Sequence, residues 1–173
     1  ETSAVPDTLS DKTFRVVVAT DWSSATVPLA VLRAYASMFR PDAPVELVVC
    51  RHEGGATYMA EADGKMNEVP GIAMVTRGPG AANAHVGLHT AWQDSTALVL
   101  FVGLIPFEHR EKEAFQEFDP HAWFGTGAKR VMVLDHPERA SEIVAEAMFA
   151  ASSGRPGPVV VGLPEDVIRE EID

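Results

Sequence analysis

The chain has 173 residues, of which 46% are apolar, and this content suits one compact domain with a sizeable core. Acidic side chains outnumber basic ones by 25 to 14, and the net charge of −11 would repel a phosphate backbone, so we expect no nucleic-acid partner. The single cysteine, Cys50, cannot form an internal disulfide, and no apolar run reaches the length of a membrane span. We therefore expect a cytoplasmic protein with no membrane partner.

Six apolar, β-branched runs predict strands, and segments with a helical pattern lie between them. In chain order, the runs cover residues 15–20, 45–50, 71–76, 98–104, 130–135 and 158–164. The helical segments are 23–40, 54–65, 80–95 and 136–154, and the apolar face expected of the last comprises Ile143, Val144, Ala147, Met148 and Ala151. Continuous apolar strands separated by helices predict one α/β domain over residues 1–173, with three α/β/α layers around a mainly parallel sheet of about six strands.

Polar or glycine-rich groups follow three successive predicted strands. Glu53 comes just after the second run, the segment 76–83 follows the third, and the segment 114–117 lies in the long aperiodic stretch after the fourth. In an open parallel sheet, ligands bind beyond the carboxyl ends of the strands. The sequence therefore predicts a site where these three segments meet.

The motifs that carry this pattern occur in a fixed order along the chain. They read RHEGGATYMAEADGK, VTRGPGAANAHVGLHTAWQDS, LVLFVG, EAFQEFD and ASSGRPGPVVVGLPEDV. Together they resemble the pyrimidine-binding, N-terminal domain of thiamine-diphosphate-dependent enzymes, and are most similar to the acetolactate synthase and pyruvate oxidase branch. The resemblance extends from about residue 45 to residue 167. It implies thiamine diphosphate as the cofactor and the decarboxylation or carboligation of a small 2-keto acid as the reaction.

The resemblance gives Glu53 a catalytic role. In this family, a glutamate after the second strand hydrogen-bonds N1′ of the aminopyrimidine ring and favours the tautomer that activates the thiazolium carbon. From the local sequence alone, the alternative is a solvated carboxylate at a strand end. The resemblance also implies that the ring is held by Thr76, Gly78, Pro79, Gly80 and Asn83. The glycines would allow a sharp turn and a close approach to the ring, although the same residues could form only a strand-to-helix turn.

Two residues of the EAFQEFD motif are expected on the substrate side. By resemblance, Gln116 is a second catalytic candidate that could hydrogen-bond the keto acid or an intermediate, and Phe115 could exclude water. The alternative for both residues is a polar surface loop. His52 adjoins Glu53, but no second histidine or cysteine stands at ligand spacing, so we interpret His52 as structural and predict no metal site in this chain.

The family's complete enzymes hold the cofactor between this domain and a separate diphosphate-binding domain. That second domain carries a GDG segment and asparagines that bind Mg²⁺, and the present sequence contains no such segment. We therefore expect the chain to need a diphosphate-binding domain or subunit that supplies Mg²⁺, and to be inactive alone. The resemblance also implies a homo-oligomer, a dimer or larger, and allows an FAD-binding domain in the full-length enzyme.

Residues 1–44 differ from the start that we expect for members of this family. The segment from Asp21 to Ser24 replaces the expected Pro-Gly turn, which indicates a divergent start or a fusion junction. Two other hypotheses follow. The chain could be a non-catalytic α/β binding or assembly module, excised or recombined from an enzyme. Residues 14–49 alone would also suit a nucleotide-sugar-binding fold.

Overall fold

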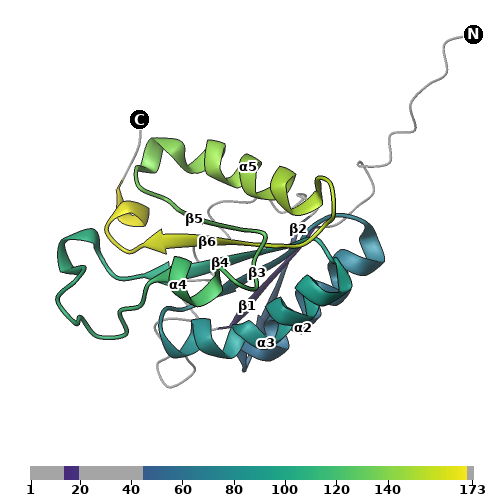
Figure 1. The fold of residues 1–173 in the computed structure, drawn as a ribbon, viewed down its shortest axis with the longest axis horizontal. Coiled ribbons are helices and arrows are strands. Elements are labelled where there is room, and N and C mark those ends of the chain that lie inside the picture. The colour runs from purple at the N-terminus through teal and green to yellow at the C-terminus, as the bar shows by residue number, and fades with distance from the viewer. Residues whose placement is uncertain (1–13, 20–44, 171–173) are drawn as a thin grey trace, which may run out of the picture.

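Six parallel strands form the sheet at the centre of the computed structural model, which describes residues 14–19 and 45–170. Their order across the sheet is β2-β1-β3-β4-β6-β5 (Figure 1), and every pairing is parallel. The strands are β1 (Phe14–Ala19), β2 (Val45–Cys50), β3 (Gly71–Val75), β4 (Leu98–Leu104), β5 (Arg130–Val133) and β6 (Pro158–Pro164). The predicted parallel sheet is thus confirmed, whereas the helix predicted over 23–40 lies outside the described residues.

Helices cover both faces of the sheet. The α-helices are α2 (Glu53–Asn67), α3 (Pro79–Asp94), α4 (Pro120–Phe124) and α5 (Ala140–Ser152), and short 3-10 helices are η1 (Phe107–His109), η2 (Pro137–Arg139) and η3 (Val167–Arg169). Helices α2 and α3 lie against one face and α5 against the other (Figure 1), which confirms the three-layer arrangement. The long aperiodic stretch after β4 contains only η1, α4 and turns before β5 begins.

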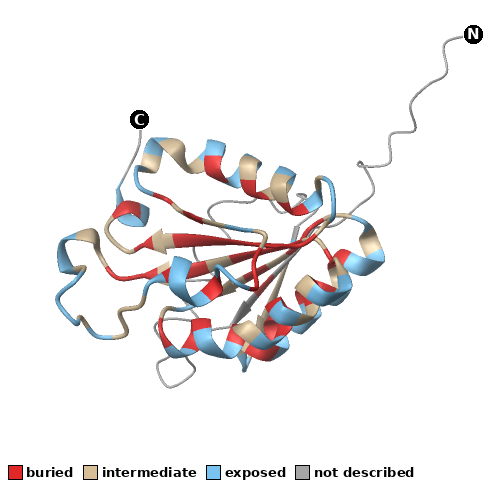
Figure 2. Ribbon diagram, in the orientation of Figure 1, coloured by how far each residue is buried: buried red, intermediate tan, exposed pale blue. Residues whose placement is uncertain are grey.

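The alternation of side chains along the central strands explains why both faces need a helix. Leu100 and Val102 of β4 join the core under α2 and α3, whereas Val99 joins the core under α5. Val160 and Val161 of β6 divide in the same way, and all five side chains are almost fully buried. The central strands accordingly carry mostly the colour of buried residues in Figure 2. Successive side chains on a strand point to opposite faces, so a strand with both faces covered must be apolar throughout.

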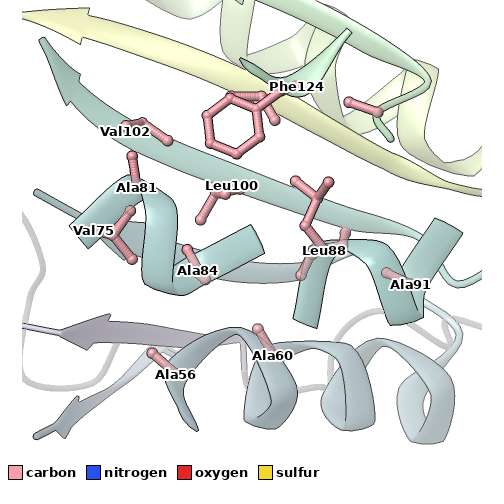
Figure 3. Packing of buried hydrophobic residues seen from close by; sticks show 14 of the residues in the cluster. Ala56, Ala60, Val75, Ala81, Ala84, Leu88, Ala91, Leu100, Val102 and Phe124 are labelled. Atoms are coloured by element: carbon pink, nitrogen blue, oxygen red, sulfur yellow. The ribbon is translucent and has the colours of Figure 1, made fainter. Parts of the chain in front are cut away.

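Helices α2 and α3 pack closely because the side chains between them are small. Ala56 and Ala60 of α2 and Ala84 of α3 are fully buried in this layer (Figure 3). Near the middle of α2, the buried Glu61 carboxylate accepts a hydrogen bond of 2.9 Å from the hydroxyl of Thr96, which follows α3. The two helices therefore lie close together, and both begin at the carboxyl edge of the sheet, where β2 and β3 end.

Helix α5 buries a narrower face than its apolar pattern predicts. Ile143, Ala147 and Ala151 are buried against the sheet, but Val144 is 42% exposed. These three residues are four positions apart, and they suffice to cover the strands beneath. The positions next to them on the helix surface therefore lie at the edge of the contact. In the part of the chain that the structure describes, no helix is both long and apolar enough to cross a membrane.

Candidate functional site

Glu53 is the first residue of α2, directly after the end of β2. His52 is the N-cap of this helix, and its Nδ1 accepts a hydrogen bond of 3.0 Å from the Gly54 amide. That bond satisfies one of the free amides at the helix start and confirms the structural interpretation of His52. A carboxylate in the first turn of a helix is also favoured by the helix dipole. The N-cap and the helix start thus fix the position of Glu53 at the end of α2 nearest to β2.

A side chain of the neighbouring helix fixes the orientation of Glu53. Asn83, in the first turns of α3, donates a hydrogen bond of 3.0 Å from Nδ2 to Oε2 of Glu53. Glu53 is half-buried, and Asn83 is exposed. The bond joins residues that are 30 positions apart in the sequence. The other carboxylate oxygen, Oε1, lies near Gly80 of the glycine turn.

The glycine turn between β3 and α3 forms the adjoining wall of the site. Gly78 is the N-cap of α3 with φ 57° and ψ −115°, a conformation that L-residues rarely adopt, and Pro79 begins the helix. A Cβ atom at Gly80 would lie 2.6 Å from Cγ2 of Thr76 and 3.2 Å from Oε1 of Glu53. The missing side chain at Gly80 therefore keeps open the space between the turn and the carboxylate.

The loop after β4 brings Gln116 to the same turn. A Cβ atom at Gly78 would lie only 2.7 Å from Cβ of Gln116, so the two backbones are in close contact. Gln116 itself has φ 64°. Phe115, by contrast, is 80% exposed. Of the predicted residues, the structure thus assembles Glu53, Thr76, Gly78, Pro79, Gly80, Asn83 and Gln116.

An ion pair that was not predicted from the sequence lies next to the glycine turn. Arg77 donates from Nη1 to Oε2 of Glu165 at 2.8 Å, and Arg169 lies 2.5 Å from the other oxygen of the same carboxylate. The hydrogen bond from Arg77 lowers the pKa of Glu165 below its ordinary value. Glu165 directly follows β6, so the rule that directs attention to strand ends would have singled it out.

The arrangement suits the binding of a flat heteroaromatic ring that contains a basic nitrogen. A carboxylate held by an amide can hydrogen-bond such a nitrogen, and a turn without side chains lets the ring approach the backbone. It does not suit a metal ion, because no group of three histidine, cysteine, aspartate or glutamate side chains within residues 14–19 and 45–170 is placed to bind one.

This fold and this arrangement define the class of protein. The family model for the N-terminal TPP binding domain of thiamine pyrophosphate enzymes matches residues 24–123, which is more than half of the chain, and the chain belongs to that family. The match begins upstream of residue 45, within the part of the sequence that we had regarded as atypical.

Curated proteins that are similar to the chain indicate the branch of the family. The chain is 35% identical over 127 residues to the acetolactate synthase large subunit of Buchnera aphidicola, 73% of this chain and 22% of that protein. It is 36% identical over 125 residues to the acetolactate synthase isozyme 3 large subunit of Escherichia coli, which covers 72% of this chain and 22% of that protein. It is 38% identical over 128 residues to the acetolactate synthase large subunit of Lactococcus lactis, which covers 74% of this chain and 22% of that protein. The chain is an acetolactate-synthase-like domain that spans about a fifth of the length of these relatives.

Proposed function

We propose that this chain supplies the pyrimidine half of a thiamine-diphosphate site, in a decarboxylase or carboligase that acts on small 2-keto acids. The observation that carries the proposal is the Asn83–Glu53 hydrogen bond of 3.0 Å beside the bare Gly80. Family membership and the printed names of the acetolactate synthase relatives support the same conclusion.

In this proposal, Glu53 holds and moves a proton at N1′ of the aminopyrimidine. Asn83 orients the Glu53 carboxylate through Oε2, which leaves Oε1 to face the ring. A carboxyl group is needed here because an amide could accept a hydrogen bond but could not exchange the proton. Thiamine diphosphate, when bound, supplies the nucleophilic carbon and the electron sink for decarboxylation. The task of this chain is to bind, orient and protonate the ring.

The turn and the loop have separate roles in the proposal. Thr76, Gly78, Pro79 and Gly80 form the wall against which the ring lies, and the close backbone contact between Gly78 and Gln116 joins that wall to the substrate side. There Gln116 would hydrogen-bond the keto acid or an intermediate. Phe115 is 80% exposed in the described chain, so its proposed part in excluding water requires a partner surface over it.

The exposed side of the site is expected to be covered by a partner. Apolar side chains are exposed on the two helices that contribute Glu53 and Asn83: Tyr58 and Met59 on α2 are 44% and 47% exposed, and Val86 on α3 is 47% exposed. A Cβ atom at Gly54 would lie 3.0 Å from Cγ1 of Val86, so Val86 lies next to the site. Exposed apolar groups of this kind mark interaction surfaces.

We propose a diphosphate-binding domain or subunit as the occupant of this surface, within a homo-oligomer. That partner would supply the Mg²⁺ site for the diphosphate. An FAD-binding domain in the complete enzyme belongs to the same proposal, since the acetolactate synthase relatives are much longer than this chain.

The test is a kinetic comparison of variants in the chain assembled with a diphosphate-binding partner, thiamine diphosphate and Mg²⁺. Glu53→Gln should lower the rate of 2-keto acid decarboxylation by about 100-fold or more, the usual contribution of a positioned acid or base. Glu138→Gln, an exposed position on η2, should leave the rate unchanged and serves as the matched control.

Two results would count against the proposal. A Glu53→Gln variant as active as wild type would remove Glu53 from the mechanism. An assembled wild-type protein that binds the cofactor but converts no 2-keto acid would favour the alternative of a non-catalytic binding or assembly module.

A further inference from the structure

Gln116 lies in a backbone conformation that needs outside support. Its φ is 64°, and two other non-glycine residues of the same loop, Glu111 and Glu113, have φ values of 60° and 54°. L-residues occupy this left-handed region only at some cost, because their Cβ atoms crowd the backbone. Three such residues within six positions would not keep one conformation without additional bonds. The question is what holds this loop, and Gln116 with it, against the glycine turn.

The Glu117 carboxylate supplies those bonds. Its Oε1 accepts a hydrogen bond of 2.5 Å from the Glu111 amide, and its Oε2 accepts one of 2.9 Å from the Ala114 amide. The Glu117 amide in turn donates to the Ala114 carbonyl at 2.9 Å. The side chain therefore closes residues 111–117 into a ring around a single carboxylate. Backbone amides that converge in this way form an anion-binding concavity, and here the anion belongs to the chain itself.

The charge of Glu117 is part of this arrangement. The backbone hydrogen bonds, first from Glu111 and then from Ala114, lower the pKa of the Glu117 carboxyl below its ordinary value, so it is ionised at neutral pH. The Arg110 guanidinium lies 3.7 Å above the centre of the Phe107 ring and within electrostatic reach of Glu117 and Asp119. An uncharged amide could accept one of the two backbone bonds, but its NH₂ group would oppose the second amide.

We propose that Glu117 is a positioning residue, whose carboxylate holds the loop so that Gln116 lies against Gly78. The contact it maintains is the one where a Cβ atom at Gly78 would meet Cβ of Gln116 at 2.7 Å. The importance of that position for the reaction rests on the function proposed above for Gln116. The role of Glu117 in holding the loop is independent of that function, because it follows from hydrogen bonds within the chain.

The first test uses the chain alone and needs no activity. In wild type, NMR should show a nuclear Overhauser effect between the Gly78 Hα and Gln116 Hβ protons, together with slow hydrogen exchange at the Glu111 and Ala114 amides. Glu117→Gln should remove the Overhauser effect and speed exchange at both amides by about tenfold or more, as loss of charge-assisted bonds predicts. Glu113→Gln, at an exposed position of the same loop, should change neither. Unchanged amide exchange at β6 would show that both variants remain folded.

The second test measures whether Glu117 acts through Gln116 in the assembled enzyme. Glu117→Gln should raise KM for the keto acid or lower kcat, and its effect should vanish in a Gln116→Ala background, since coupled residues are not additive. Retained Gly78–Gln116 contact and unchanged exchange in Glu117→Gln would overturn the proposal whatever the activity. Additive kinetic effects would also overturn it, while an inactive wild type would count against the proposed function alone.

Discussion

Gly80 sets how close a ligand can come to Glu53. A methyl group at this position would lie 2.6 Å from Cγ2 of Thr76 and 3.2 Å from Oε1 of Glu53, so one of these groups must shift. We expect Gly80→Ala to lower the free energy of unfolding by about 1–3 kcal/mol, the usual cost of overpacking.

Gly55 on α2 is the matched control for this prediction. A Cβ atom there meets nothing within 4 Å, and no positive φ is present, so Gly55→Ala should raise stability by about 0.5–1 kcal/mol. Denaturant unfolding monitored by circular dichroism measures both changes. Equal stability of the two variants would mean that the turn is looser than the structure shows.

The sequence predicted which residues meet at the ends of the strands, but not the hydrogen bonds between them. Glu53 and Asn83 stand in motifs whose order identifies the family. The hydrogen bond between them depends on how closely α2 and α3 approach, which no local pattern encodes. The folding back of Glu117 onto two amides depends on positive φ values at non-glycine residues, which the sequence does not mark.

The ends of β3 and β6 are joined by the Arg77–Glu165 ion pair. Its two side chains are 28% and 29% exposed, so the bond is partly shielded from water. We expect Glu165→Gln to lower the free energy of unfolding at pH 7 by about 0.5–1 kcal/mol. Glu170→Gln, at an exposed position near η3, should have no effect.

The pH dependence of this difference follows from the pKa of Glu165, which the Arg77 bond lowers below the ordinary value of 4.5. A carboxyl group with a lowered folded-state pKa contributes stability above its unfolded-state pKa and loses that contribution as the pH falls. The stability gap between wild type and Glu165→Gln should therefore narrow as the pH falls below about 4.5. A gap that stays constant down to pH 3 would show that the pair is not the cause.

At the level of elements, the sequence predicted positions well and contacts less well. Each of the six apolar runs matches an observed strand to within two residues at either end, and β2, β4 and β6 have the predicted ends. Thr76 was predicted in a strand, but β3 ends at Val75 because the chain turns there toward Gly78. Val144 was placed on the buried face of α5 but is exposed, since periodicity alone does not tell how wide the covered face is.

For the whole molecule, the three layers followed from the sequence and the strand order did not. Apolar runs without alternation indicate strands buried on both faces, and β4 and β6 lie at the centre of the core for this reason. Which strands pair depends on contacts between distant segments, such as β4 with β6, and the runs themselves are too similar to specify it. The open surface beside Glu53 could not be predicted either, because it depends on where α2 and α3 meet.

The central claim is that the chain holds the pyrimidine half of a cofactor site, with Glu53 at its centre. Calorimetric titration of thiamine diphosphate with Mg²⁺ tests it most directly, in the chain alone, in the chain with a diphosphate-binding partner, and in that assembly carrying Glu53→Ala. We expect little or no binding by the chain alone, saturable binding by the assembly, and binding weakened about tenfold or more by the substitution. A Kd below about 1 µM for the chain alone, or equal affinity with and without Glu53, would contradict the account.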